Sequence, residues 1–166
     1  MRGIKWAILA SAIVVAAIPP TALGDTTTAI DATLMNTVVS GPGDIPGGRD
    51  SSPLGVGWHD AAGGWHARNV PVSDDIVDGS GAPIGTMNRS VSFNVHVATG
   101  ASTAWCDFTM TLTGFGTFEG HCNGSLLEGH FSGHGSPGST LSGTYALAPG
   151  GIPGVGPYLL DMVVRS

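Results

Sequence analysis

Hydrophobic and polar residues alternate with a period of two over several stretches of this chain. The clearest stretches are residues 91–97 and 158–164, where apolar residues occupy every second position. Successive side chains of a β-strand point to opposite faces, so each stretch predicts a strand with one buried face. Weaker patterns predict a strand over residues 30–39 and a hairpin of residues 54–59 and 65–70. Glycine- and proline-rich segments predict loops at 41–53, 78–83 and 148–157.

Short turn signals link the strands of the second half and set their register. A three-residue loop centred on Gly114 pairs Cys106 with Cys122 as cross-strand neighbours. The turn at Ser136-Pro137-Gly138 sets Phe131 opposite Gly143 and Tyr145 opposite Gly129. Each aromatic ring is therefore predicted to lie over a glycine of the next strand, so that large residues and gaps interleave.

The dipeptide Asn123-Gly124 lies between two near-repeats, Phe118-Glu119-Gly120-His121-Cys122 and Leu127-Glu128-Gly129-His130-Phe131. Asn-Gly favours a two-residue hairpin turn, because both central residues of that turn need positive φ. This turn predicts Cys122 opposite Ser125 and Glu119 opposite Glu128, with both histidines on the carboxylate face.

The whole pattern predicts an all-β fold: a small antiparallel up-and-down β-barrel of about eight strands, with a two-sheet β-sandwich as the alternative. No lysine follows residue 24 to protect an open sheet edge, and closure into a barrel removes edges, which favours the barrel. The predicted interior is apolar and suits a small hydrophobic ligand, unless the side chains fill it. The residues predicted to line it are Phe108, Met110, Phe118, Phe131, Tyr145 and Met162.

The first 24 residues have the pattern of a secretory signal peptide. Arg2 and Lys5 precede an apolar run from Trp6 to Ile18, and small residues follow at cleavage-site spacing. That run is short for a membrane span, so no transmembrane segment is expected in the mature chain. Residues 25–166 are then expected to form one secreted domain. Aromatic residues at strand centres favour a soluble core over an outer-membrane barrel.

The net charge of the chain restricts the classes of partner that it can bind. Without the leader, four arginines face twelve acidic residues, a formal charge of −8. Such a chain repels nucleic-acid phosphates and anionic lipid headgroups, which excludes those partners. Small molecules, a cell-surface component or cations fit better. Because an exported chain meets an oxidising compartment, Cys106 and Cys122 are expected to form a disulfide.

Two groups of residues are candidate sites. Glu119, His121, Glu128 and His130 share the predicted polar face, and imidazole with carboxylate suits zinc or copper, whereas the simpler interpretation is a solvated face. Trp58 is predicted opposite Trp65 in the near-repeat Gly57-Trp58-His59 and Gly64-Trp65-His66, which gives either a buried pair or a stacking platform for a sugar or another flat ligand.

Catalytic motifs are absent from the sequence. It has no Gly-x-Ser-x-Gly elbow and, beyond the leader, no lysine for a Schiff base. Asp107 and His121, predicted to be cross-strand neighbours, could orient a base, but no serine partner is dictated. Leu141-Ser142-Gly143-Thr144-Tyr145 resembles strands of small antiparallel barrels such as avidins and allene oxide cyclases, and nothing beyond the barrel is carried over. We therefore expect an exported, noncatalytic binding or structural module with no cofactor, and a zinc- or copper-binding protein, with possible hydrolytic activity, as the alternative.

Overall fold

A computed structural model describes residues 25–39 and 57–166 of this chain. The predicted leader, the loop 41–53 and residues 54–56 of the predicted hairpin lie outside the described residues. The described residues form nine strands and no helix long and apolar enough to cross a membrane. The strands are β1 (Thr27–Val39), β2 (Trp58–His59), β3 (Gly64–Asp78), β4 (Pro83–His96), β5 (Ala101–Leu112), β6 (Gly116–Gly124), β7 (Glu128–Gly135), β8 (Thr140–Ile152) and β9 (Gly156–Arg165).

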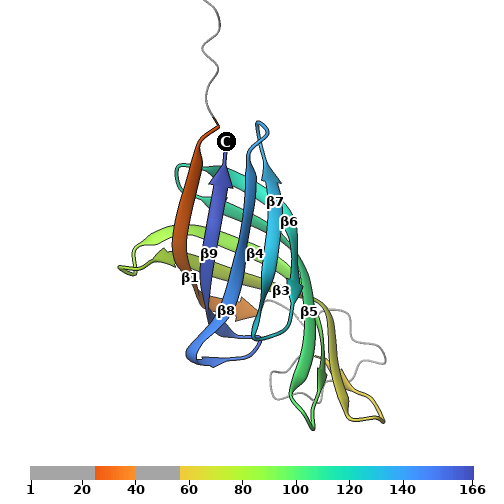
Figure 1. The fold of residues 1–166 in the computed structure, drawn as a ribbon. Coiled ribbons are helices and arrows are strands. Elements are labelled where there is room, and N and C mark those ends of the chain that lie inside the picture. The colour runs from red at the N-terminus through yellow and green to blue at the C-terminus, as the bar shows by residue number, and fades with distance from the viewer. Residues whose placement is uncertain (1–24, 40–56) are drawn as a thin grey trace, which may run out of the picture.

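The sheet closes on itself into an antiparallel barrel (Figure 1). The strand order is β1-β9-β8-β7-β6-β5-β4-β3-β2, and a further pairing of β1 with β3 completes an eight-stranded barrel with β2 as the extra strand. The predicted barrel is confirmed, and the sandwich is excluded because one continuous ladder joins all eight strands. Strand β2 pairs with β3 outside the region where β1 does so.

Several predicted registers are confirmed. The loop at Gly114 pairs Cys106 with Cys122, and these residues form a disulfide with a Cα–Cα distance of 4.9 Å. Between β7 and β8, Phe131 pairs with Gly143. A Cβ at Gly143 would lie 2.6 Å from the ring of Phe131, so only glycine leaves room for that ring. Glycine and aromatic residues therefore interleave as the turn signals predicted.

The segment 148–157 is a much shorter loop than predicted. Strand β8 continues to Ile152 and β9 begins at Gly156, where these two residues pair. Glycine and proline weaken a strand signal in the sequence, but edge positions and irregular registers tolerate both. A register shift between Leu147 and Ile152 marks such an irregularity.

The inward-facing side chains fill the barrel. Of the six residues predicted to line the interior, five are buried, and Tyr145 is half-buried. The rings of Phe108 and Phe131 meet edge to face, with centroids 6.1 Å apart. The remaining free space has a volume of about 40 Å³. That is room for one or two water molecules, whereas ligand pockets measure about 300–1,000 Å³.

One ion pair lies inside this apolar core. The guanidinium of Arg89 on β4 donates to both carboxylate oxygens of Asp74 on β3, at 2.7 and 2.9 Å. The Asp74 side chain has no exposed surface and that of Arg89 has 13%. The planar fork of the guanidinium matches a carboxylate, so both charges are satisfied where water is excluded.

The predicted two-residue turn at Asn123-Gly124 is wrong. Gly124 pairs with Gly129, and the loop between them brings Glu119 opposite His134 instead of Glu128. Leu126, at the centre of the loop, is buried and lines the small internal space. Burial of this leucine favours the longer loop over the local turn preference of Asn-Gly.

Two tyrosines hold this loop across one end of the barrel. The hydroxyl of Tyr145 donates to the carbonyl of Ser125 at 2.9 Å, and that of Tyr158 donates to the carbonyl of Leu126 at 2.8 Å. The Tyr158 hydroxyl also accepts a hydrogen bond from the backbone of Gly154 in the β8–β9 loop. Burial raises the pKa of Tyr145 to about 12 and also raises the pKa of Tyr158.

These tyrosines make the protein sensitive to alkali. Both folded pKa values lie above the ordinary value of about 10, so the stabilisation they give is complete below pH 10 and is lost as pH rises from 10 towards 12. We expect the melting temperature to fall over that interval and Tyr145→Phe to remove part of the fall. Ultraviolet titration of the folded protein should show less than half of its tyrosine ionised at pH 10, because both pKa values lie above 10. Ionisation of both tyrosines at that pH would contradict the prediction.

Candidate binding groove

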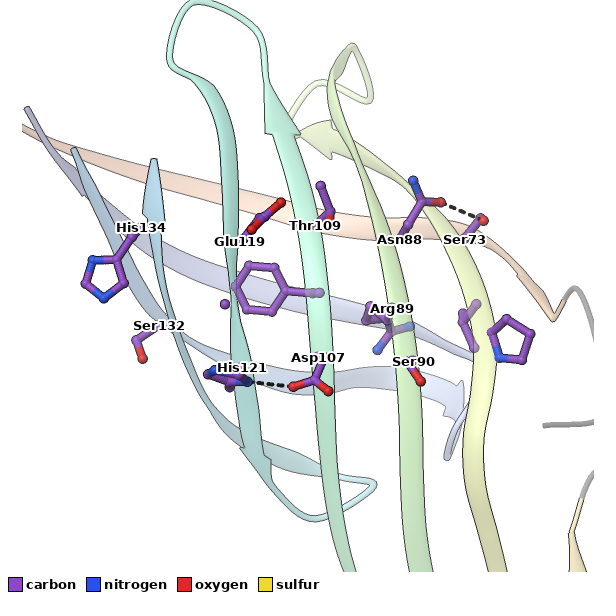
Figure 2. A pocket seen from close by; sticks show the side chains of 14 residues that line it. Ser73, Asn88, Arg89, Ser90, Asp107, Thr109, Glu119, His121, Ser132 and His134 are labelled. Carbon is purple, nitrogen blue, oxygen red and sulfur yellow. Dashed lines mark hydrogen bonds and ion pairs between the residues drawn. The ribbon is translucent and has the colours of Figure 1, made fainter. Parts of the chain in front are cut away.

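A groove of about 700 Å³ crosses the outer face of strands β3 to β7 (Figure 2). Its outward side chains form two rows of cross-strand neighbours, one residue from each strand. Between these rows the groove is also lined by Val72, Arg89, Phe108 and Gly120. The Asp107 row consists of Pro71, Ser90, Asp107, His121 and Ser132. The Glu119 row consists of Ser73, Asn88, Thr109, Glu119 and His134. Nine of these ten residues are polar, because the alternation that buries their neighbours directs them outward.

An imidazole–carboxylate pair lies in the first row. Nδ1 of His121 and Oδ1 of Asp107 are 2.6 Å apart, and both side chains are highly exposed, at 75% and 78%. An ionised carboxylate only accepts, so Nδ1 is the donor and Nε2 faces the groove or solvent. Figure 2 shows Ser132 on the next strand, where it is the cross-strand neighbour of His121. No hydrogen bond joins these two side chains in the described structure.

The four predicted metal ligands are not brought together. Glu119 pairs with His134, and Glu128 begins the same strand six residues earlier. Six residues of strand span about 20 Å, which separates the two carboxylates that the predicted turn placed side by side. Among residues 25–39 and 57–166, no group of three or more histidine, cysteine, aspartate or glutamate side chains could hold a metal ion.

The predicted Trp58–Trp65 pair is also wrong by one residue. Trp58 pairs with His66, and His59 pairs with Trp65, so the two indoles lie on opposite faces of the sheet. Trp65 packs against Phe93, with ring centroids 4.9 Å apart. The cause is the turn, where the Asp60 side chain accepts hydrogen bonds from the backbone of Ala62 and Gly64 and the Asp60 amide donates to the carbonyl of Gly64, so that Asp60 instead of His59 faces Gly64.

Asp60 also anchors the hairpin through a histidine. Its Oδ2 lies 2.8 Å from Nε2 of His66, whose Nδ1 lies 2.7 Å from Oδ1 of Asn94 on β4. The hydrogen bond from His66, with that from the Gly64 backbone, lowers the pKa of Asp60 below its ordinary value. This network ties β2 and its turn to the barrel wall.

Trp58 instead belongs to an outward-facing stack that the sequence did not reveal. The guanidinium of Arg68 lies 5.5 Å from the ring centroid of Trp58 and 4.9 Å from that of Trp105. A register shift between Ala67 and Val70 redirects the chain here, and Arg68 lies within this bulge. Bulges leave little signal in a hydrophobic pattern, so the stack could not be derived from alternation alone.

A scan against protein-family models gave no match, and a search of the curated proteins gave none either. The site must therefore be interpreted from its own geometry.

Proposed function

We propose that this protein is an exported, noncatalytic binding module whose ligand occupies the outer groove rather than the barrel interior. The contrast in free volume supports this proposal: about 700 Å³ in the groove against about 40 Å³ inside. The outer volume falls within the range of small-molecule sites, and the inner volume falls far below it. A hydrophobic ligand inside the barrel would have to displace close-packed side chains such as Met110 and Met162, which are fully buried.

The polar lining selects the chemistry of the ligand. Carboxylates accept hydrogen bonds, while hydroxyl, amide and imidazole groups of both rows donate or accept. Asp107 and Glu119 both lie in the groove, and the guanidinium of Arg89, which also lines it, is already paired with Asp74, so the lining disfavours anions. The best match is a polar ligand, neutral or positively charged, with several hydroxyl or amino groups.

A binding role fits the groove better than catalysis. Catalysis depends on pre-organised groups in a site that excludes water. The side chains of Asp107 and His121 are about three-quarters exposed, and water competes for both. Ser132 lacks the hydrogen bond to imidazole that would activate it as a nucleophile.

Export is supported by two independent features. The first 24 residues have the charge and hydropathy pattern of a signal peptide. The disulfide between Cys106 and Cys122 is consistent with an oxidising compartment outside the cytoplasm. The groove would then face ligands of the periplasm, cell surface or medium.

Chemical-shift mapping with small probes tests the proposal. Glycerol, glucose and spermine represent polar ligands, and benzene represents an apolar ligand for the interior. We expect at least one polar probe to give saturable shifts at His121 and Ser132, and benzene to give none at Met110 and Met162. Saturable benzene shifts in the interior, or no groove shift with any polar probe, would refute the assignment.

Two exposed histidines provide a matched pair of variants. His121 lines the groove, whereas His96, exposed at the end of β4 and six residues from Ser90, does not. His121→Ala should weaken binding of the polar probe about tenfold, the effect of losing one hydrogen bond of about 1.4 kcal/mol. His96→Ala should leave the affinity unchanged. Equal loss in both variants would show that the shifts do not report on the groove.

A further inference from the structure

Within the stack of Trp58, Arg68 and Trp105, the indole of Trp105 lies on β5 next to the polar groove, whose lining on that strand begins at Asp107. Trp105 and Asp107 both point outward on this strand and are two residues apart, a distance of about 7 Å. Asn123, the cross-strand neighbour of Trp105, lies two residues beyond His121 on β6. The indole of Trp105 therefore lies directly beside the Asp107 row, two residues away on the same strand.

Arg68 fixes the orientation of this indole. Its guanidinium covers one face of the Trp105 ring at 4.9 Å, and it is itself held by hydrogen bonds to the carbonyls of Ala67 and Phe93 and to Asn94. Trp105 is nevertheless 38% exposed, so part of its ring surface remains open to a ligand. A rigid indole with exposed surface beside a polar groove loses little conformational entropy when a ligand stacks on it.

We propose that the ligand of this groove is a neutral oligosaccharide, with one sugar ring stacked on Trp105 and the following rings hydrogen-bonded by the Asp107 and Glu119 rows. This inference rests on the proposed function and adds the class of ligand. A pyranose ring has an apolar C–H face that suits an indole, and a rim of hydroxyls that both donate and accept hydrogen bonds.

The composition of the groove matches those hydroxyls. The carboxylates of Asp107 and Glu119 accept from sugar hydroxyls in charge-assisted hydrogen bonds. Asn88 and Ser132 lie in the same two rows and offer donors as well as acceptors. Along the strands, the surface extends about 13 Å from Trp105 to the Glu119 row. Across the strands, the groove is five strands wide, or about 19 Å. This area accommodates several sugar rings.

Other ligand classes fit less well. The two groove carboxylates and the net negative charge of the chain repel acidic glycans. An extended peptide adds to an open sheet edge, whereas strands β3 to β7, which carry the groove, are each paired on both sides within the closed barrel. A flat aromatic ligand would use Trp105 but leave the polar rows unpaired.

Calorimetric titration of the exported protein with cellohexaose, laminarihexaose and N-acetylchitohexaose tests the proposal, with an oligogalacturonide as the anionic control. We expect at least one neutral hexasaccharide to bind at least tenfold more tightly than glucose, and the oligogalacturonide to bind more weakly than any of them. Trp105→Ala should weaken binding at least tenfold, and Trp105→Phe should weaken it less. Binding of none of the neutral hexasaccharides, or unchanged affinity in Trp105→Ala, would overturn the proposal.

A matched control and a second readout separate the two proposals. Phe115 is 37% exposed, like Trp105, but lies in the β5–β6 turn, so Phe115→Ala should bind the hexasaccharide normally. Loss of affinity in Phe115→Ala as well would count against a specific role of Trp105. If spermine or glycerol shifts the groove resonances while every hexasaccharide fails, the sugar assignment falls and the binding groove stands. If no probe shifts them, both proposals fall.

Discussion

Asp74→Ala should lower the free energy of unfolding by about 3–5 kcal/mol, the effect of removing one partner from a buried ion pair. Asp74 has no exposed side-chain surface, and both its oxygens accept from the guanidinium of Arg89. Without the carboxylate, the largely buried guanidinium of Arg89 loses the anion that compensates its charge in the apolar barrel. Urea denaturation followed by tryptophan fluorescence measures the loss.

A double variant separates the charge effect from the loss of packing. Asp74→Leu combined with Arg89→Met replaces both charges with apolar groups and leaves no buried ion, so most of the stability should return. Asp107→Asn, at a highly exposed carboxylate on the outer face, should change stability by no more than about 0.5 kcal/mol. A double variant as unstable as Asp74→Ala alone would contradict the proposed cause.

The ion pair also explains why part of the barrel was not predicted. Strands β3 and β4 continue through residues 71–78 and 83–90, which sequence analysis did not assign to strands. Asp74 and Arg89 occupy inward positions there, so charged residues stand where alternation requires apolar ones. The inward position of each charged residue is explained only by its partner, which lies on the other strand.

Turn chemistry predicted the register correctly across the Gly114 loop, whose side chains are exposed, and the pairings from Leu112 to Cys106 follow the prediction. The loop after Gly124 instead buries Leu126 and accepts hydrogen bonds from two tyrosines of distant strands. Those contacts lie outside any local window, so the Asn-Gly signal gave the wrong partner for Glu119.

The same difference explains how much of the site was predictable. Alternation correctly placed Asp107, Glu119 and His121 on the outer face, because an error of an even number of residues in register does not change which face a side chain occupies. Alternation could not predict which residues of adjacent strands are cross-strand neighbours. The groove therefore combines predicted residues with Ser132 and His134, which only the true register brings beside them.

Replacing both cysteines, Cys106→Ser with Cys122→Ser, should lower the free energy of unfolding by about 3 kcal/mol and the melting temperature by roughly 10 °C. The bridge joins two cysteines that are 16 residues apart in the sequence and lie on neighbouring strands. Without it, the segment between them gains conformational freedom in the unfolded chain. Calorimetry of the oxidised protein, the reduced protein and the double variant measures the effect. Reduction should lower the melting temperature of the wild type and leave that of the double variant unchanged.

The bridge and the groove rows lie on opposite faces of β5 and β6, so the folded double variant should still bind the groove probes. Lost binding together with an unchanged melting temperature would show that the bridge shapes the groove instead of restricting the unfolded chain.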